Sequence, residues 1–375
     1  MQYKDIIGQE RLKQGLVDMI NRGRMPHALI LSGKEGVGQL PLAIATAQYM
    51  SCTDKQGLDS CGNCWSCRQF ESLQHPDLHF VFPIAQNKKK HIERSDDVIS
   101  EFREAYQQNP YLTQEEWLNT FGENKKGQIY TAEGDEIIRK LNIKSFVSPY
   151  KFMVIWYPEL MHASCANKVL KIIEEPPENT IFFLVSTNPN AILGTIRSRA
   201  QQIMMPPIET VALKTAFTQK YQLDENQVNF LIKAAQGSWS HLLQSVSQSA
   251  KQVQHQEWFM TMMRSGYSMN LEDLRKWVDE IAATSRREQM EFLQSAQRLL
   301  RENLIFALKN PQLTYMNAPE MAFAQKFSLF VNVHNVEEIS KELNLAEAQI
   351  EQNVNSKIVL TDTVLKFYRL LRLKA

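Results

Sequence analysis

Residues 27–50 read HALILSGKEGVGQLPLAIATAQYM, and their order of strand, glycine loop and helix decides the fold class. The run HALILSG has the length and composition of a buried strand. The loop GKEGVGQLP follows it, and LAIATAQYM is apolar enough for a helix that packs inside the protein. A glycine loop between a strand and a helix aims backbone N–H groups at the start of the helix, where anions bind.

Further apolar runs continue this alternation. We expect strands near residues 79–82 (HFVF), at 151–156 (KFMVIW) and at 180–187 (TIFFLVST). Helical spacing of apolar residues predicts helices at 9–22 and 163–175, and two prolines end the second one. Continuous apolar strands that alternate with helices predict an α/β fold with a parallel sheet covered on both faces.

The glycine loop lacks the side chains that make such a loop catalytic. A working phosphate loop reads G-x-x-x-x-G-K-[ST], in which the lysine neutralises phosphate charge and the hydroxyl binds Mg²⁺. This chain keeps Gly33, Gly36 and Gly38, but Gln39 and Leu40 replace the lysine and the hydroxyl. We therefore expect no ATP hydrolysis. The glycines either only turn the chain or leave weak anion binding at the helix N-terminus.

The strand at 151–156 lacks a second part of the same chemistry. In an ATP-hydrolysing protein of this kind, the strand ends in an acid that holds Mg²⁺. Here it ends in Trp156, Tyr157 and Pro158, and Glu159 lies beyond the proline and off the strand tip. This loss does not depend on the loss of the lysine, so two observations point away from an active ATPase.

Four of the five cysteines lie close together, at Cys52, Cys61, Cys64 and Cys67. The spacing in CGNCWSC suits short turns that present thiolates to a tetrahedral Zn²⁺. We expect a closed structural zinc site, because no neighbouring His or carboxylate pattern leaves a position for water. Disulfides are the alternative, which the lack of a secretory signal disfavours. Cys165 is expected to be a small buried residue.

Composition and charge exclude other functions. The 375 residues suggest two or three domains, and the 42 basic and 41 acidic residues leave a net charge of +1. No field of the whole molecule therefore draws the chain to DNA or to an anionic membrane. No apolar run approaches the roughly 18 residues that span a bilayer, so we expect no membrane association and a cytoplasmic location.

Residues 84–128 interrupt the α/β pattern and are interpreted as an insertion. The segment begins with QNKKKHIERSDD, and a helix is expected around DDVISEFREAYQ. The lysines at 88–90 could contact phosphate, but we expect a solvated, acid-balanced surface excursion with no assigned chemistry. After residue 209 the strand signals largely cease, so the rest of the chain is expected to be helical.

Several of these segments together resemble the AAA+ clamp-loader subunits of bacterial DNA polymerase III, in particular the delta-prime subunits. The resemblance spans most of residues 1–207, without the insertion, and is weaker in NVNSKIVLTDTVLKFYRLL near the end. It is carried by GQERLKQGLVDMINRGRMPHALILSGKEGVG, the cysteine knuckle, NKVLKIIEEPPENTIFFLVSTNP and TIRSRAQQI.

The resemblance implies three domains. Residues 1–207 would form the α/β domain, with a zinc module at about 50–70 and the insertion at 84–128. A small helical lid would follow at 208–252, and a helical collar at 253–375 would mediate assembly into an open ring. In this family the delta-prime subunit does not hydrolyse ATP, in agreement with the losses described above.

The resemblance also implies roles for single residues. The family carries a Ser-Arg-Cys motif whose arginine reaches into the ATP site of a neighbouring subunit, and this chain has Ser198, Arg199 and Ala200. The arginine is retained although the cysteine is not. On the residues alone, Arg199 is as readily one of a surface pair with Arg197. Thr187 matches the polar sensor position at the end of a strand.

A second sensor, an arginine after Gly-Ser in the lid, is missing because residues 237–240 read GSWS. The implied protein is a non-catalytic subunit of the clamp loader, within the DNA polymerase III holoenzyme. It would brace a hetero-oligomeric ring of gamma/tau ATPase and delta subunits and give Arg199 to a neighbour. The sliding clamp and primer-template DNA would be reached through that assembly.

Two other functions stay open. An active motor subunit of the same family would have to tolerate Gln39 and Leu40. A zinc-dependent DNA-binding module would read DNA through the cysteine knuckle, but only Lys55 and Arg68 supply positive charge near it. That is too few for the phosphate contacts that dominate affinity for DNA.

Overall fold

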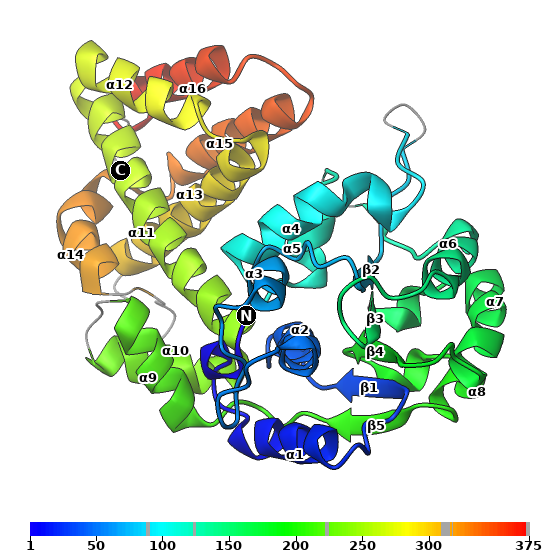
Figure 1. The fold of residues 1–375 in the computed structure, drawn as a ribbon. Coiled ribbons are helices and arrows are strands. Elements are labelled where there is room, and N and C mark those ends of the chain that lie inside the picture. Colours follow the sequence, from blue (N-terminus) through cyan, green and yellow to red (C-terminus); the bar gives the residue numbers. More distant parts are fainter. Residues whose placement is uncertain (88–90, 123–124, 222–224, 309–315, 317, 373–375) are drawn as a thin grey trace. The chain divides into compact units, whose positions relative to one another are not determined.

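The computed structural model describes residues 1–87, 91–122, 125–221, 225–308, 316 and 318–372 (Figure 1). The lysines at 88–90 lie outside these residues. The chain divides into two compact units, Met1–Ser245 and Val246–Ala375, which are described one after the other. Within the described ranges, none of the helices combines the length and the apolar character needed to cross a membrane.

The first unit is built on a five-stranded parallel sheet, which confirms the predicted fold class. Its strands are β1 (Ala28–Ser32), β2 (Leu78–Val81), β3 (Lys151–Trp156), β4 (Thr180–Ser186) and β5 (Gln201–Met204). They lie in the order β2-β3-β4-β1-β5, with Leu29 of β1 opposite Phe183 on one side and Gln201 on the other. The carboxyl ends of all strands therefore meet at one edge, where the phosphate loop follows β1.

Helices cover both faces of the sheet because its inner strands are apolar on both sides. The helix α2 (Gln39–Ser51) lies on one face, against β1, β3 and β4. The helices α6 (Thr131–Asn142) and α7 (Ala163–Glu174) lie on the opposite face, as Figure 1 shows. Phe182 and Leu184 of β4 pack in the core shared with α6 and α7, and Phe183 between them is equally buried.

The edge strand β5 was not predicted from the sequence. It pairs only with β1 in the described part of the sheet, and its residues Gln201, Gln202 and Met204 are exposed. An edge strand without a buried face needs no apolar run, so periodicity gives no signal for it.

The insertion at 84–128 is not a solvated surface excursion, and that expectation is wrong. It contains α4 (Ile99–Gln108) and α5 (Gln114–Asn119), from which Phe102 and Trp117 are completely buried. The Phe102 ring stacks on Phe82 with centroids 4.2 Å apart and lies 5.6 Å from Trp156 of β3. The apolar side chains of the insertion thus extend the core of the sheet. The charged residues of the same segment had led to the prediction that it is exposed to solvent.

The first unit contains further helices. They are α1 (Glu10–Asn21), α3 (Trp65–Glu71), α8 (Gly194–Arg197), α9 (Thr210–Lys220), α10 (Glu225–Ala235) and the first turns of α11 (Trp239–Ser268). The helices α9, α10 and the start of α11 lie in residues 208–252, which the resemblance predicts to be a lid. The lid boundary at residue 252 falls inside α11 and stays a prediction.

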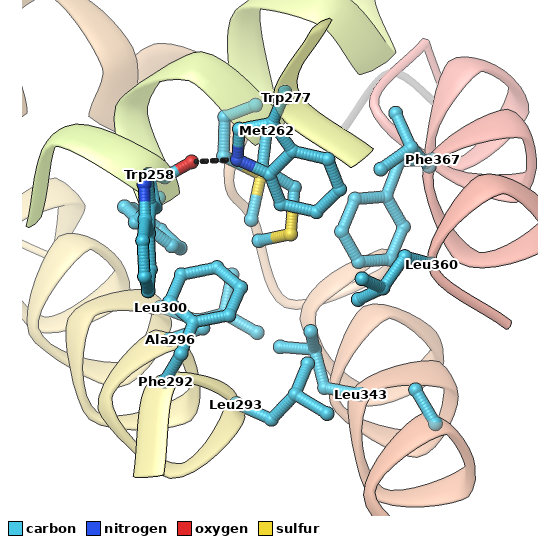
Figure 2. Close-up of a cluster of buried hydrophobic side chains, with 14 of the residues drawn as sticks. Trp258, Met262, Trp277, Phe292, Leu293, Ala296, Leu300, Leu343, Leu360 and Phe367 are labelled. Carbon is cyan, nitrogen blue, oxygen red and sulfur yellow. Dashed lines mark hydrogen bonds between the residues drawn. The ribbon is translucent and has the colours of Figure 1, made fainter. Parts of the chain in front are cut away.

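The described part of the second unit is helical, as expected. It contains the rest of α11 with α12 (Leu271–Ala282), α13 (Arg286–Ala307), α14 (Ala318–Phe327), α15 (Val336–Glu351) and α16 (Ser356–Leu370). Figure 2 shows its core, in which Trp258, Trp277 and Phe292 lie together. The indole N–H of Trp277 donates to the carbonyl oxygen of Trp258 at 2.9 Å, so the polar end of this buried ring is satisfied.

Candidate functional site

The phosphate loop, residues 33–38, joins β1 to α2 at the carboxyl edge of the sheet, and Gln39 and Leu40 are the first residues of α2. Gly36 and Gly38 have positive φ angles of 79° and 99°, which favour glycine at both positions. Gln39 is buried, and its Nε2 atom donates to the carbonyl oxygens of Gly33 and Lys34 at 2.8 Å each. The Gln39 amide, which replaces the lysine, therefore forms hydrogen bonds with the backbone of the loop rather than facing a ligand. The side chain of Lys34 is exposed and that of Leu40 is buried.

Residues 110–114 of the insertion lie against this loop. A Cβ atom on Gly38 would be 3.2 Å from the Tyr111 ring, and the Tyr111 hydroxyl accepts from the backbone N–H of Ile7 at 2.8 Å. Burial raises the pKa of Tyr111, so its phenol stays neutral at physiological pH. The cavity between this segment, the loop and the ends of β3 and β4 is about 20 Å³. That volume holds about one water molecule, whereas a triphosphate needs far more.

A carboxylate lines the same cavity. Glu35 Oε1 accepts from the Tyr157 hydroxyl at 2.5 Å and from the backbone N–H of Gln114 at 3.0 Å. Burial, followed by the charge of Glu35, raises the pKa of Tyr157 well above its usual range. Tyr157 directly follows β3, where the sequence predicts the loss of the magnesium-binding acid. The Tyr157 hydroxyl lies there instead and donates to the Glu35 carboxylate of the loop. A negatively charged Glu35 would repel phosphate.

The start of α11 is hydrogen-bonded to the phosphate loop. The backbone N–H of Trp239 donates to the carbonyl oxygen of Gly36 at 2.9 Å, and the Ser238 hydroxyl donates to the backbone carbonyl oxygen of Glu35 at 2.8 Å. Ser240 Oγ donates to the carbonyl oxygen of Tyr111 at 2.6 Å. Trp239 follows Gly-Ser, where the ATP-hydrolysing relatives would carry the sensor arginine, and its side chain is buried. The start of α11, the loop and the insertion are thus joined by one backbone N–H and two serine hydroxyls, all of which donate to backbone carbonyl oxygens.

Gly36→Ala tests this junction. A Cβ atom there would clash with Ser238 Oγ and lie 2.7 Å from Ser240 Oγ, in a backbone conformation that disfavours alanine. We expect the free energy of unfolding of the first unit to fall by about 2–4 kcal/mol. Gly23→Ala is the matched control, because Gly23 has a φ of 63° and no atom within 4 Å of its Cβ position. It should cost about 1 kcal/mol in urea denaturation, and equal losses in the two variants would contradict the tight contact.

The predicted sensor Thr187 follows β4, is exposed and lines the cavity of the phosphate loop. Its backbone N–H and its hydroxyl both donate to Glu159 Oε1, at 2.9 and 3.2 Å, and the N–H of Asn188 donates to the same atom at 3.0 Å. Glu159 therefore contacts the tip of β4, although the sequence placed it off the tip of β3. Residue spacing gives no signal for this contact, because it joins two loops.

The cysteine cluster, Cys52, Cys61, Cys64 and Cys67, is assembled as predicted. Its four sulfur atoms all lie within 4.8 Å of one another, with 3.9 Å between those of Cys61 and Cys67. Tetrahedral zinc with Zn–S bonds of about 2.3 Å places sulfurs about 3.8 Å apart. All five cysteines are free thiols in this structure, and four sulfurs gathered around one point suit a metal ion better than a pair of disulfides.

Backbone donors surround the cluster. The N–H of Cys64 donates to Cys61 Sγ at 3.3 Å, and the N–H of Cys67 donates to Cys64 Sγ at 3.5 Å. Burial alone would raise the pKa of Cys64, but the backbone N–H groups of Cys67 and Thr53 lower it to about 6. The environment of Cys64 therefore favours its thiolate, the form that a metal requires. Burial instead raises the pKa of Cys52 and of Cys67, so a metal bound there would have to displace their protons. Cys165 lies elsewhere, fully buried as predicted, and burial raises its pKa to about 12.

Ser198 and Arg199 follow the short helix α8 and do not line the cavity of the phosphate loop. Arg199 Nη2 forms an ion pair with Glu174 Oε1 at 3.1 Å, and Nη1 donates to the carbonyl oxygen of Thr195 at 2.9 Å. Its side chain is 34% exposed. Arg197 instead donates to Asn190 at 2.9 Å. The two arginines therefore have different partners, and only Arg199 is held by a carboxylate in these contacts.

Comparison with known proteins identifies the family of this chain. A family model described as DNA polymerase III, delta subunit, matches residues 8–209, more than half of the chain. The chain is 28% identical over 207 residues to DNA polymerase III subunit delta' of Bacillus subtilis (strain 168), covering 55% of this chain and 50% of that protein. It is 26% identical over 224 residues to subunit delta' of Escherichia coli (strain K12), covering 60% and 55%.

The chain thus spans about half the length of these relatives. Among solved structures, a DNA polymerase III gamma subunit-related protein from Thermotoga maritima aligns with 96% of this chain and 99% of its own, at 14% identity and a TM-score of 0.38. The family model covers the phosphate loop, the cysteine cluster and Arg199, and ends before α9.

Proposed function

Because this chain belongs to the DNA polymerase III delta subunit family, we propose that it is a clamp-loader subunit that hydrolyses no ATP itself. The observation that carries this proposal is the closed phosphate loop. Gln39 ties the loop to itself, Tyr111 covers Gly38, and the remaining cavity is about 20 Å³. The charge of Glu35 in the same cavity acts in the same direction, since it opposes a polyphosphate.

We further propose that Arg199 acts at the ATP site of a neighbouring subunit. A guanidinium is planar and permanently charged, and it can donate two parallel hydrogen bonds to phosphate oxygens. In the isolated chain the Glu174 carboxylate accepts one of these bonds. A γ-phosphate carries more negative charge than a carboxylate, so it can replace Glu174 as the partner. Ser198 Oγ, 3.4 Å from Nη1, would help to orient the side chain.

The cysteine cluster would hold a structural Zn²⁺. Cys52 immediately follows α2 and Cys67 lies in α3, so a shared ion would fasten these two helices together. Four sulfur ligands complete a tetrahedral site and leave no position for a reacting water. The proposed metal therefore stabilises the unit and takes no part in a reaction.

Together these parts describe a cytoplasmic subunit that braces a ring of gamma/tau and delta subunits. Residues 208–252 would be its lid and 253–375 its collar. The ring would act on the sliding clamp and on primer-template DNA. The decisive experiment has two measurements: Mg-ATP turnover by the purified chain, and the native mass of the complex that co-purifies with it. We expect no turnover above background and a hetero-oligomer. Vigorous turnover by the chain alone would instead favour an active motor subunit.

Two changes could prevent ATP binding: the loss of the motif lysine and hydroxyl, and the closure of the pocket. Restoring the two motif side chains tests these changes separately. The double variant Gln39→Lys with Leu40→Thr rebuilds the motif, but Glu35 and Tyr111 still occupy its surroundings. We expect no saturable binding when a fluorescent ATP analogue is titrated with Mg²⁺. A variant that adds Glu35→Gln and Tyr111→Ala should gain binding that the double variant lacks. Tight binding by the double variant would show that the segment around Tyr111 does not close the site.

A further inference from the structure

A groove in the second unit lies between α11 and α14 and has a volume of about 510 Å³. That volume falls within the usual range of binding pockets, about 300–1,000 Å³. The α11 residues that line it recur at helical spacing and therefore share one face of the helix: Met260, Met263, Arg264 and Tyr267. The facing wall comes mainly from α14: Ala322, Phe323, Lys326 and Phe327, followed by Phe330.

The walls of this groove are aromatic and are anchored in the core. The rings of Phe323 and Phe327 stack with centroids 4.8 Å apart, and Tyr267 lies 4.6 Å from Phe330. Met263 and Phe327 are buried members of the core of the unit. The shape of the groove is therefore set by packing that exists before anything binds, which favours a preformed site.

The charged side chains that line the groove are both cationic. Arg264 and Lys326 are exposed, and neither side chain has an ion-pair partner among the described residues. Arg372 adds a third positive charge nearby, since its guanidinium lies 5.3 Å from the centre of the Tyr267 ring. No acidic residue occurs among the described residues that line the groove. An apolar floor with an unpaired basic rim is complementary to an occupant that carries apolar and acidic groups.

We propose that this groove binds an amphipathic segment of a partner protein in which acidic residues flank aromatic or leucine side chains. Two helices with apolar faces form the walls, which is the geometry that accepts such segments. The apolar side chains would fill the space over Met263 and Phe327. The carboxylates would pair with Arg264 and Lys326, and a basic segment would be repelled. This site does not depend on the phosphate loop or on Arg199.

The experiment selects binders for the full chain from a random twelve-residue peptide library. We expect the enriched peptides to combine Asp or Glu with Phe, Trp or Leu. Their affinity should fall at least tenfold in the double variant Arg264→Glu with Lys326→Glu. The matched control is Arg275→Glu with Arg286→Glu, which makes the same charge change at exposed positions outside the groove. This control should leave the affinity unchanged.

A second variant tests the apolar floor without removing core atoms. Ala322 is exposed and lines the groove, so Ala322→Trp should fill the groove and weaken the same peptides at least tenfold. Thermal melting of each variant checks that the second unit stays folded. The proposal is overturned if no peptide is enriched, if the enriched peptides are basic, or if they keep their affinity in both groove variants. Binding of dodecanoate without any peptide binding would also overturn it.

Discussion

Replacing Arg199 by alanine in the assembled clamp loader is expected to slow ATP hydrolysis at the neighbouring site about a thousandfold or more. An arginine supplied by a second subunit stabilises the charge on the transferring phosphoryl group and is worth about 10³–10⁵ in rate. The structure holds this guanidinium at the surface in an ion pair with Glu174, 34% exposed, where an exchange of partner needs no refolding. The measurement is steady-state ATP turnover by the reconstituted complex.

The neighbouring arginine supplies the control. Arg197 donates to Asn190 rather than to a carboxylate, so Arg197→Ala should leave turnover within about twofold of normal. Arg199→Lys keeps the charge but loses the planar pair of donors, so it should recover little of the rate. Gel filtration of each complex shows whether the ring has assembled. Normal turnover by an assembled Arg199→Ala complex would remove the proposed role of this residue.

Cys61→Ser is expected to abolish zinc binding and to unfold the segment from Cys52 to α3. Structural zinc contributes about 10–16 kcal/mol of binding free energy in small zinc-dependent peptides, and that energy is available only to the folded segment. The sheet should stay folded, because the core on its α6–α7 face consists of apolar contacts that include none of the four clustered cysteines. Elemental analysis should find one Zn²⁺ per chain in the unsubstituted protein and none in the variant, and hydrogen exchange should reveal unprotected amides in α3.

Cys165→Ala is the matched control for the cysteine cluster. Cys165 is buried against the sheet and takes no part in the cluster, so the variant should keep its zinc and the protection of α3. A chelator should reproduce the Cys61→Ser result in the control protein. If the purified protein contains no metal and α3 is protected all the same, the cluster is not a zinc site.

Sequence reasoning succeeded where a single position or a fixed spacing carries the information. The apolar run at 151–156 coincides with β3, and the cysteine spacing predicts the cluster. The clustered cysteines are close together in the chain, and β3 is buried on both faces, so each feature leaves a local signal in the sequence. The loss of phosphate chemistry at Gln39 and Leu40 stays a prediction.

The rest depended on contacts between distant segments. Residue Tyr111, in the segment 110–114 that lies against the phosphate loop, contacts both Gly38 and Ser240, and no local pattern indicates that these three residues meet. The charges at the start of the insertion suggested a solvated segment, although its later residues Phe102 and Trp117 form part of the core. The hydrogen bond from Thr187 to Glu159 likewise follows only from the way two parallel strands end side by side.

The hydrogen bonds from Ser238 and Trp239 connect the start of α11 to the phosphate loop. In a nucleotide-driven subunit, the angle between lid and sheet follows the bound nucleotide. Under the proposed function, the hydrogen bonds from Ser238 and Trp239 would set this angle when the chain folds, without a nucleotide. The subunit would then keep one geometry whatever the ratio of ATP to ADP, through growth and starvation alike.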